Sequence, residues 1–535
     1  MLLTERMIPL SENRTAGVLC NISSLPGPYG VGCFGEDARA FIDLLHEMDF
    51  RWWQVLPFNP LDSMNSPYTS PSAFAGNLLY IDPRDLLRRG LITPEEEAAS
   101  RWDGSPYTAA YDFAKERRRS LLKTAFSRAD ETLRAEVRAF ADKTAWLPDF
   151  ALYMAVKEAN GEKPWWEWPD DCADYARCAA RREEYRDGAA FWEFTQYLFF
   201  TEWEELHRYA HEKGIGVLGD MPVYVALDSA DVWSHTGLFQ LDPDAHRPTK
   251  VAGVPPDYFS ADGQLWGNPL YDWDAMKRDG YRWWVDRIGA ALGIYDRVRI
   301  DHFRGLASYW AVPAGAKTAK EGAWEPGPGQ ALFDAVAKAY PSPAIIAEDL
   351  GVFGEDVTAL LESTGFPGMR VVQFGFDPGG DSTHLPHNYP FNCLAYIGTH
   401  DNNTLLGWLW EASPAERAFA LRYCGFEGEN WGEGGYKSPS CRKIIETVWR
   451  SSAKTAVIAF QDLCGFGSDA RMNIPGVPES NWRVRTTAET LAGIDKAYYK
   501  EINRLYRRDG ANVFIPPVLS PVSAAPAFPD GQGNP

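Results

Sequence analysis

The sequence has few cysteines, and their spacing suits neither a disulfide framework nor a zinc site. Its 535 residues include eight cysteines, with no C-x-x-C pair and no cysteine–histidine cluster at zinc-ligand spacing. Disulfide-stapled domains and zinc modules depend on such patterns. We therefore expect no disulfide framework, no metal site and a reducing compartment.

Signals for secretion and for membrane insertion are also lacking. The N-terminal residues MLLTERMIPLSENR carry Glu5 and Arg6 where a signal peptide needs an unbroken apolar stretch. One uncharged apolar segment, 511–529, contains five prolines, which would break a membrane-spanning helix repeatedly and leave backbone groups unsatisfied in lipid. We expect this segment to be an extended tail and the protein to be cytoplasmic, without a membrane partner.

Positive charge is scarce as well. The chain has 53 Lys and Arg residues against 73 Asp and Glu, a formal net charge of −20, which argues against nucleic acid and anionic membrane surfaces as partners. A neutral or small ligand is expected instead. Aromatic residues, by contrast, reach 14% and include 21 tryptophans. Composition leaves two interpretations of these rings open, as anchors of the core or as flat platforms for sugars.

Length and hydrophobic patterning predict a large α/β enzyme. At roughly 100–200 residues per domain, the length allows about three or four domains, or one enzyme domain with insertions. Short aliphatic or β-branched runs end abruptly in polar, Gly or Pro residues, as buried parallel strands do where they lead into functional loops. Most are followed by helical patterns, which favours a (β/α)8 TIM barrel, although the periodicity also allows a doubly wound sheet. The eight runs are 17–21, 52–57, 216–220, 297–301, 344–348, 370–374, 395–401 and 457–462.

The gap between the second and third runs, from about residue 82 to 213, is too long for one crossover helix. It contains apolar residues at helical spacing, such as Leu133, Val137 and Phe140. We predict a mainly helical inserted subdomain over 83–213. The barrel would then comprise 1–82 and 214–508, with long βα loops over the active site. Residues 509–535 would form a Pro-rich C-terminal tail.

Three carboxylates stand at the ends of predicted strands. Asp301 ends the run RVRID, and Arg299, two residues earlier, projects to the same side of a strand and favours an ionised carboxylate. A structural Arg–Asp ion pair is the alternative. Glu348 follows four buried-type residues that could raise its pKa and keep a proton on it, and Asp401 lies in the turn THDNN. In a barrel these strand ends form the catalytic mouth.

Such a set of carboxylates fits glycoside chemistry. One group protonates the departing oxygen, a second attacks or stabilises the cationic sugar, and a third can orient ring hydroxyls. The segments RIDHFRG (299–305), EDLG (348–351) and THDN (399–402) resemble the characteristic regions of the α-amylase clan.

Other segments are similar to those of the amylomaltase family of 4-α-glucanotransferases, also called disproportionating enzymes. The resemblance extends from about residue 17 to 508, and at 481–485 a second tryptophan would be expected. The segments are SPYTSPSAFAGN (66–77), GDMPVY (219–224), GVPPDYFSADGQLWGNP (253–269), QDLCGFG (461–467) and ARMNIPG (470–476).

The resemblance implies roles for individual residues. Asp301 would be the nucleophile, Glu348 the general acid/base and Asp401 the transition-state stabiliser of a retaining double displacement. The implied partners are α-1,4-glucans and maltooligosaccharides, with transfer to a 4-hydroxyl and no cofactor. The implied substrate-binding residues are Asp220, Arg299 and His400 around the donor glucose, Asp257, Gln264 and Trp266 on a loop over the groove, and Tyr68, Phe374 and Asn473 at further subsites.

Two rival functions share these features. A hydrolase on the same scaffold would use the same three carboxylates, and transfer is favoured by the 253–269 loop, where Trp266 could shield the intermediate from water. A non-catalytic glucan-binding protein should lack at least one of the carboxylates, and all three are present. The oligomeric state is not set by any feature of the sequence.

Overall fold

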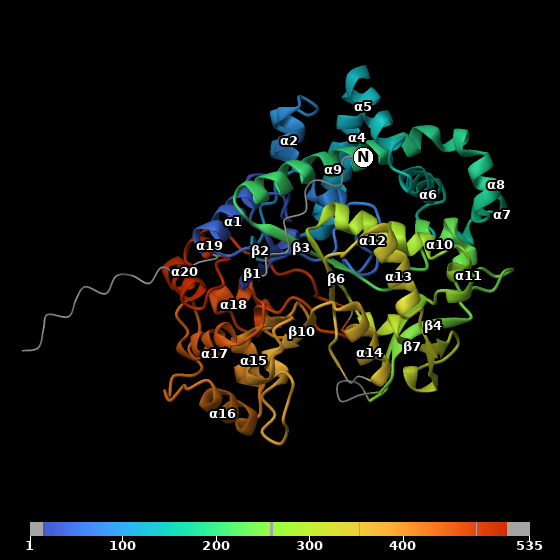
Figure 1. Cartoon of the computed structure of the whole chain (residues 1–535). Coiled ribbons are helices and arrows are strands. Elements are labelled where there is room, and N and C mark those ends of the chain that lie inside the picture. Colours follow the sequence, from blue (N-terminus) through green and yellow to red (C-terminus); the bar gives the residue numbers. More distant parts are fainter. Residues whose placement is uncertain (1–13, 257–260, 352–353, 478, 511–535) are drawn as a thin grey trace, which may run out of the picture.

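An eight-stranded parallel sheet forms the centre of the molecule (Figure 1). The computed structural model describes residues 14–256, 261–351, 354–477 and 479–510. The order of the strands in the sheet is β10-β11-β12-β1-β2-β3-β6-β9, with every neighbouring pair parallel. These strands are β1 (Thr15–Leu19), β2 (Trp52–Gln54), β3 (Gly216–Met221), β6 (Arg297–Ile300), β9 (Ile345–Ala347), β10 (Gly368–Val371), β11 (Cys393–Tyr396) and β12 (Thr455–Ala459).

The sheet closes on itself between β9 and β10. The backbone N–H of Ala347 donates to the carbonyl of Pro367, just before β10, over 3.0 Å. Each of the eight predicted runs overlaps one of these strands, so the (β/α)8 barrel prediction is confirmed and the doubly wound alternative is wrong. Every residue of β1, β3 and β12 is buried, which explains why these strands appear in the sequence as continuous apolar runs.

The stretch between β2 and β3 forms helices in the structure, eight of them α-helices. Its longest helix, α9, buries Phe194 and Leu198 and packs against α6, and the indole of Trp203 donates to the carbonyl of Ile294 over 3.0 Å. These helices are α2 (Pro83–Arg88), α3 (Pro94–Ala99), α4 (Tyr111–Arg128), α5 (Glu131–Ala141), α6 (Leu147–Ala159), α7 (Asp170–Ala173), α8 (Tyr175–Ala180) and α9 (Arg186–Glu212).

The remaining helices lie between and after the barrel strands (Figure 1). None of the described helices is long and apolar enough to cross a membrane. The remaining α-helices are α1 (Glu36–Glu47), α10 (Ala230–Ser234), α11 (Trp273–Arg278), α12 (Arg282–Ile294), α13 (Gln330–Ala339), α14 (Glu355–Thr364), α15 (Leu405–Glu411), α16 (Pro414–Tyr423), α17 (Pro439–Arg450), α18 (Phe460–Cys464), α19 (Ala488–Ala492) and α20 (Lys496–Leu505). From residue 511 onward, the predicted C-terminal tail lies outside the described residues.

A second, antiparallel sheet was not predicted. Its order is β5-β4-β7-β8, with β4 (Lys250–Val254) and β5 (Gln264–Pro269) before β6 and with β7 (Ser308–Pro313) and β8 (Ala323–Pro326) after it. The strands β4 and β5 belong to the connection from β3 to β6, and β7 and β8 belong to the connection from β6 to β9. Asp301 directly follows β6, so the sheet is built from the connections before and after the strand that leads to this carboxylate. It is therefore part of the loop layer over the carboxyl ends of the barrel strands.

Candidate active site

A buried ion pair joins two neighbouring strands below the site. Asp220 on β3 and Arg299 on β6 are partners in the register of the two strands. Arg299 donates from Nε to Asp220 Oδ1 over 3.0 Å and from Nη2 to Asp220 Oδ2 over 2.7 Å. The same Nη2 also donates to Asp301 Oδ1 over 2.8 Å. The sequence indicated the second contact, and the structure adds the bidentate pair with Asp220, which fixes the guanidinium.

Asp301 and Glu348 follow adjacent strands at the same level of the barrel. Ile300 on β6 and Ala347 on β9 are register partners, and the two carboxylates are the next residues of their chains. Both oxygens of Glu348 accept backbone N–H groups at 2.7 Å, one from His302 and one from Leu350. The turn after Asp301 depends on the left-handed conformation of His302, whose φ is +51°. The two carboxyl groups are therefore held beside each other by the backbone of one turn.

The environment divides the protons between these two groups. Burial raises the pKa of Glu348 to about 8, and the negative charge of Asp301 adds to this rise. Burial also raises the pKa of Asp301, to about 6, against the lowering effect of Arg299. The expectation that Arg299 sets the protonation of Asp301 is thus incomplete, because desolvation and the charge of Asp220 outweigh it. Between the two values Asp301 is ionised and Glu348 keeps its proton.

Asp401 is positioned by the segment ARMNIPG. Asn473 donates from its amide to Asp401 Oδ1 over 2.5 Å, and Arg471 donates to the backbone carbonyl of Asp401 over 2.6 Å. His400 Nε2 lies 3.3 Å from the other carboxylate oxygen. The Asp401 side chain is 43% exposed, so its carboxylate is held in place yet open to a ligand.

An aromatic cluster stands behind Asp220 and Asp401. The hydroxyl of Tyr68 donates to Asp220 Oδ2 over 2.7 Å, and burial raises the pKa of this phenol, which keeps the proton on the donor. The Tyr68 ring is stacked on His400, with centroids 5.0 Å apart and planes 20° apart. Trp482 packs against both rings, at 5.5 and 5.8 Å. Sequence reasoning assigned no role to Trp482, although it noted the segment in which this residue lies.

Gln264 and Trp266 come from β5 of the second sheet. The indole of Trp266 donates to Gln264 Oε1 over 3.1 Å, and its ring meets the ring of His302 edge to face at 4.8 Å. Trp266 is 38% exposed and therefore offers a ring face next to the turn that follows Asp301. Asp257, predicted on the same loop, lies outside the described residues.

Phe374 lies apart from these contacts, in the turn that follows β10. Its ring meets His384 edge to face at 5.6 Å, and 38% of the residue is exposed. It therefore stands on the same end of the barrel as the carboxylates and presents an apolar surface there.

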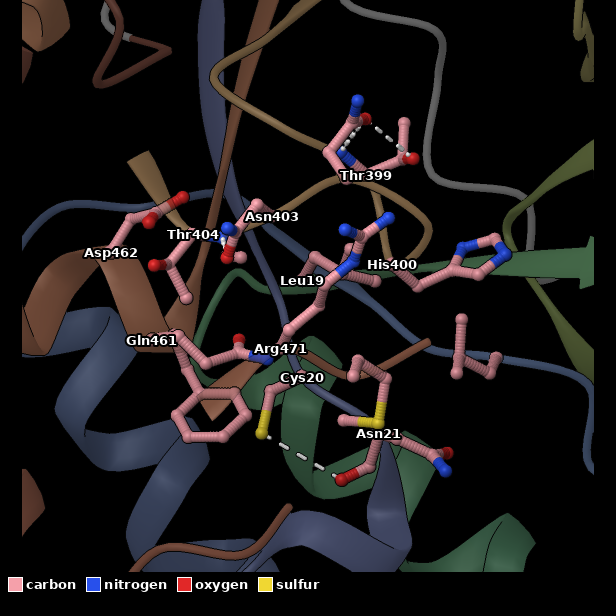
Figure 2. Close-up of a pocket in the computed structure, with 15 residues that line it drawn as sticks. Leu19, Cys20, Asn21, Thr399, His400, Asn403, Thr404, Gln461, Asp462 and Arg471 are labelled. Atoms are coloured by element: carbon pink, nitrogen blue, oxygen red, sulfur yellow. Dashed lines mark hydrogen bonds between the residues drawn. The ribbon is translucent and has the colours of Figure 1, made fainter. Parts of the chain in front are cut away.

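A small cavity lies between the ends of β1, β11 and β12 (Figure 2). Its walls include His400, Arg471 and Asp462, and its volume of about 20 Å³ holds one water molecule and no sugar ring. Burial raises the pKa of Asp462 to about 7, and this carboxyl accepts the N–H of Leu405 over 2.7 Å. The cavity is therefore too small to hold the expected substrate.

Comparison with known proteins places these features in one family. Residues 20–490 match the family model described as 4-alpha-glucanotransferase. The chain is 42% identical over 513 residues to the 4-alpha-glucanotransferase of Streptococcus pneumoniae, covering 94% of this chain and 99% of the relative. It is 44% identical over 487 residues to that of Thermus thermophilus, covering 88% and 94%. Among solved structures, it is similar to the amylomaltase from Streptococcus agalactiae in complex with acarbose. That match has a TM-score of 0.88 at 39% identity and covers 92% of this chain and 99% of the other.

Proposed function

The chain belongs to the 4-alpha-glucanotransferase family, and from this premise we propose that Asp301, Glu348 and Asp401 are its catalytic residues. The activity is the transfer of a 1,4-α-glucan segment to the 4-hydroxyl of an acceptor. The single observation that carries the residue assignment is the register of β6 and β9, which sets an ionised Asp301 beside a protonated Glu348.

The first half of the reaction forms a covalent intermediate. Asp301 attacks the anomeric carbon of the donor glucose, and the bond from this carbon to the glycosidic oxygen breaks. Glu348 gives its proton to that oxygen, so the leaving glucan departs with a free 4-hydroxyl. The order of the two pKa values supports these roles, because the nucleophile needs a negative charge and the acid needs a proton.

The second half reverses these roles. The 4-hydroxyl of an acceptor glucan attacks the anomeric carbon, its proton passes to the Glu348 carboxylate, and the bond to Asp301 breaks. Two displacements at one carbon retain the α configuration. Asp401 faces the positive charge that develops on the sugar ring in both steps, and Asn473 and His400 keep its carboxylate in position.

We further propose α-1,4-glucans and maltooligosaccharides as substrates. Exposed aromatic faces suit the apolar C–H faces of sugar rings, and Trp266 and Phe374 offer such faces at the carboxyl end of the barrel. Arg299, Asp220 and Tyr68 form one hydrogen-bonded unit that supports the donor site. The buried free thiols fit the reducing environment of the cytoplasm, where we place the enzyme.

Incubation with maltotriose tests both the activity and its rival. Transfer yields glucose together with a ladder of longer maltooligosaccharides, whereas hydrolysis yields glucose and maltose alone. We expect the ladder, and its loss in Asp301→Ala and Glu348→Gln at unchanged circular dichroism. Products without lengthened chains would contradict the transferase activity and indicate a hydrolase on the same scaffold.

A further inference from the structure

A compact group of two histidines and one aspartate lies away from the proposed active site. His207 and His211 are one turn apart on α9, and Asp296 immediately precedes β6. His207 Nε2 lies 3.0 Å from Asp296 Oδ2, and His211 Nε2 lies 2.9 and 3.0 Å from the two oxygens of the same carboxylate. The nearest potential ligand atoms of the three residues all lie within 4.8 Å of one another.

The positions of these side chains are fixed by their surroundings. The His207 ring is stacked on Trp203 at 5.2 Å with planes 12° apart, and the two imidazole centroids are 4.2 Å apart. The backbone N–H of Val217 donates to Asp296 Oδ2 over 2.7 Å, which orients the carboxylate toward the helix. The Asp296 side chain is only 4% exposed, whereas those of His207 and His211 are 18% and 20% exposed. A small ion from solvent can therefore reach a set of ligands that is already oriented.

We propose that His207, His211 and Asp296 bind one divalent transition-metal ion of the Zn²⁺ type. Imidazole nitrogen and carboxylate oxygen are preferred ligands of such ions, at about 2.0–2.2 Å from the metal. Around a tetrahedral ion, ligand atoms at these distances are separated by roughly 3.3 Å. The separations of 2.9–3.0 Å between the imidazole nitrogens and the Asp296 oxygens are slightly shorter, so binding requires these atoms to move apart by a few tenths of an ångström. Water completes the coordination on the exposed side.

Metal binding redistributes the protons of the two imidazole rings. In the metal-free arrangement each Nε2–H donates to Asp296, and in the metal-bound arrangement each Nε2 offers its lone pair to the ion. The ring proton moves to Nδ1 of a neutral imidazole, and any proton of an imidazolium leaves to solvent.

The consequence of the bound ion is a cross-link in the fold. His211 and Asp296 are 85 residues apart in the sequence, and they join the last turns of α9 to the start of β6. Figure 1 shows α9 as the long green helix, which packs against β3. Asp296 and Asp301 stand at opposite ends of β6, so the ion takes no part in glucan transfer. Its effect is on the stability of the folded chain.

Metal binding to the untagged full-length chain tests the proposal directly. Titration calorimetry with Zn²⁺ should show one ion per chain, and Co²⁺ should give the visible absorption of a low-symmetry site with nitrogen and oxygen ligands. At a free metal concentration about 100 times Kd, the folded state is favoured about 100-fold over an unfolded chain that binds no metal, which raises Tm. Mg²⁺ should produce none of these effects, because it prefers oxygen ligands in an octahedral arrangement.

Substitutions locate the site and separate it from catalysis. His207→Ala and His211→Ala should each lose the Co²⁺ spectrum and the metal-dependent rise in Tm, while His387→Ala, a change at an exposed histidine on another surface, should keep both. Asp296→Asn serves as a third variant if either alanine variant fails to fold. We expect the folded histidine variants to keep unchanged maltotriose transfer. Failure of the metal-site proposal can therefore be distinguished from failure of the proposed function, on which it does not depend. Absence of one-to-one binding by the unmodified chain, or an unaltered Co²⁺ spectrum in both histidine variants, would overturn the proposal.

Discussion

At the scale of single residues, the proposed mechanism depends on which of two neighbouring carboxyl groups holds a proton. Burial raises the pKa of both Asp301 and Glu348, yet the two carboxyl groups differ in their hydrogen-bond partners and charged neighbours. Arg299 contacts Asp301 directly, while Glu348 faces the negative charge of Asp301. The pKa values of about 6 and about 8 follow from this asymmetry. The enzyme therefore has one reactive protonation state, bounded on both sides by pH.

We expect a bell-shaped dependence of kcat/KM on pH. Protonation of Asp301 removes the nucleophile as pH falls through about 6, and ionisation of Glu348 removes the acid as pH rises through about 8. In Glu348→Gln the alkaline limb should disappear for a donor with a fluoride leaving group, which needs no proton. Initial rates across pH 4–10 measure both effects. A profile that stays flat from pH 5 to 9 would contradict the assignment of acid and nucleophile.

Tyr68→Phe tests the hydrogen-bonded unit around Arg299. The substitution keeps the stacked ring on His400 but removes the hydroxyl that donates to Asp220. Without this hydrogen bond Asp220 and Arg299 are held less firmly, so kcat/KM for maltotriose should fall. The upper limit is about one to two orders of magnitude, which corresponds to losing all of the roughly 1.5–3 kcal/mol in the transition state. Tyr107→Phe is the matched control, since Tyr107 is 55% exposed. Equal activity of the two variants would show that Tyr68 acts through its ring alone.

The sequence reveals the three proposed catalytic residues because each follows an apolar run. Asp301, Glu348 and Asp401 all follow barrel strands, and the expected strand positions are confirmed. The contacts of Trp482 were not predictable, because they depend on a late segment that folds back over Tyr68 and His400. The raised pKa of Asp301 was also missed, since local spacing reveals a neighbouring cation but does not reveal desolvation.

At the scale of elements, the barrel and the second sheet differ in how far the sequence reveals them. Strands buried on both faces, such as β12, read as apolar runs. In β5, by contrast, Leu265, Trp266 and Gly267 are exposed, and the strand lies next to proline- and glycine-containing turns. Such a strand forms through pairing with β4 and has no periodic pattern of its own. The loops over the site are therefore the part of the fold that the sequence predicts least.

Trp266→Ala tests the role of β5 in choosing the acceptor. An acceptor sugar stacked on the indole gains proximity to the intermediate that water does not gain. A loss of about 1.4 kcal/mol of selective stabilisation shifts the ratio of transfer to hydrolysis roughly tenfold toward hydrolysis. Free glucose and lengthened products, separated by chromatography, give this ratio. Trp324→Ala, at another exposed tryptophan of the same sheet, is the control. An unchanged ratio of transfer to hydrolysis in Trp266→Ala would show that the Trp266 ring serves packing and does not bind the acceptor.

At the scale of the whole molecule, the two ends of the described chain meet at the start of the barrel. The backbone N–H of Ala16 on β1 donates to the carbonyl of Arg508 over 3.0 Å, and Thr15 and Asp509 form an antiparallel bridge. Arg508 is fully buried beside the first residues of β1 and β12. Its guanidinium donates to the carbonyls of Trp449, Thr15, Ala453 and Ser451. The side chain of Arg508, which follows α20, thus contacts the end of α17, the first residue of β1 and the loop before β12.

Arg508→Met should destabilise the fold without changing the chemistry of the site. Arg14 also donates to the carbonyls of Trp449 and Ser451, so the substitution leaves Thr15 and Ala453 as the carbonyls without their side-chain donor. At about 1–3 kcal/mol for each buried group left unsatisfied, the free energy of unfolding should fall by roughly 2–6 kcal/mol. Denaturant unfolding measures this loss. Arg504→Met is the matched control, because Arg504 lies on α20, four residues before Arg508, and its side chain is 59% exposed in an ion pair with Asp49. This change should alter stability by less than about 1 kcal/mol. If both variants lose the same small amount, the packing of the chain ends against β1 and β12 does not depend on Arg508, and the contacts between the chain ends follow from backbone pairing alone.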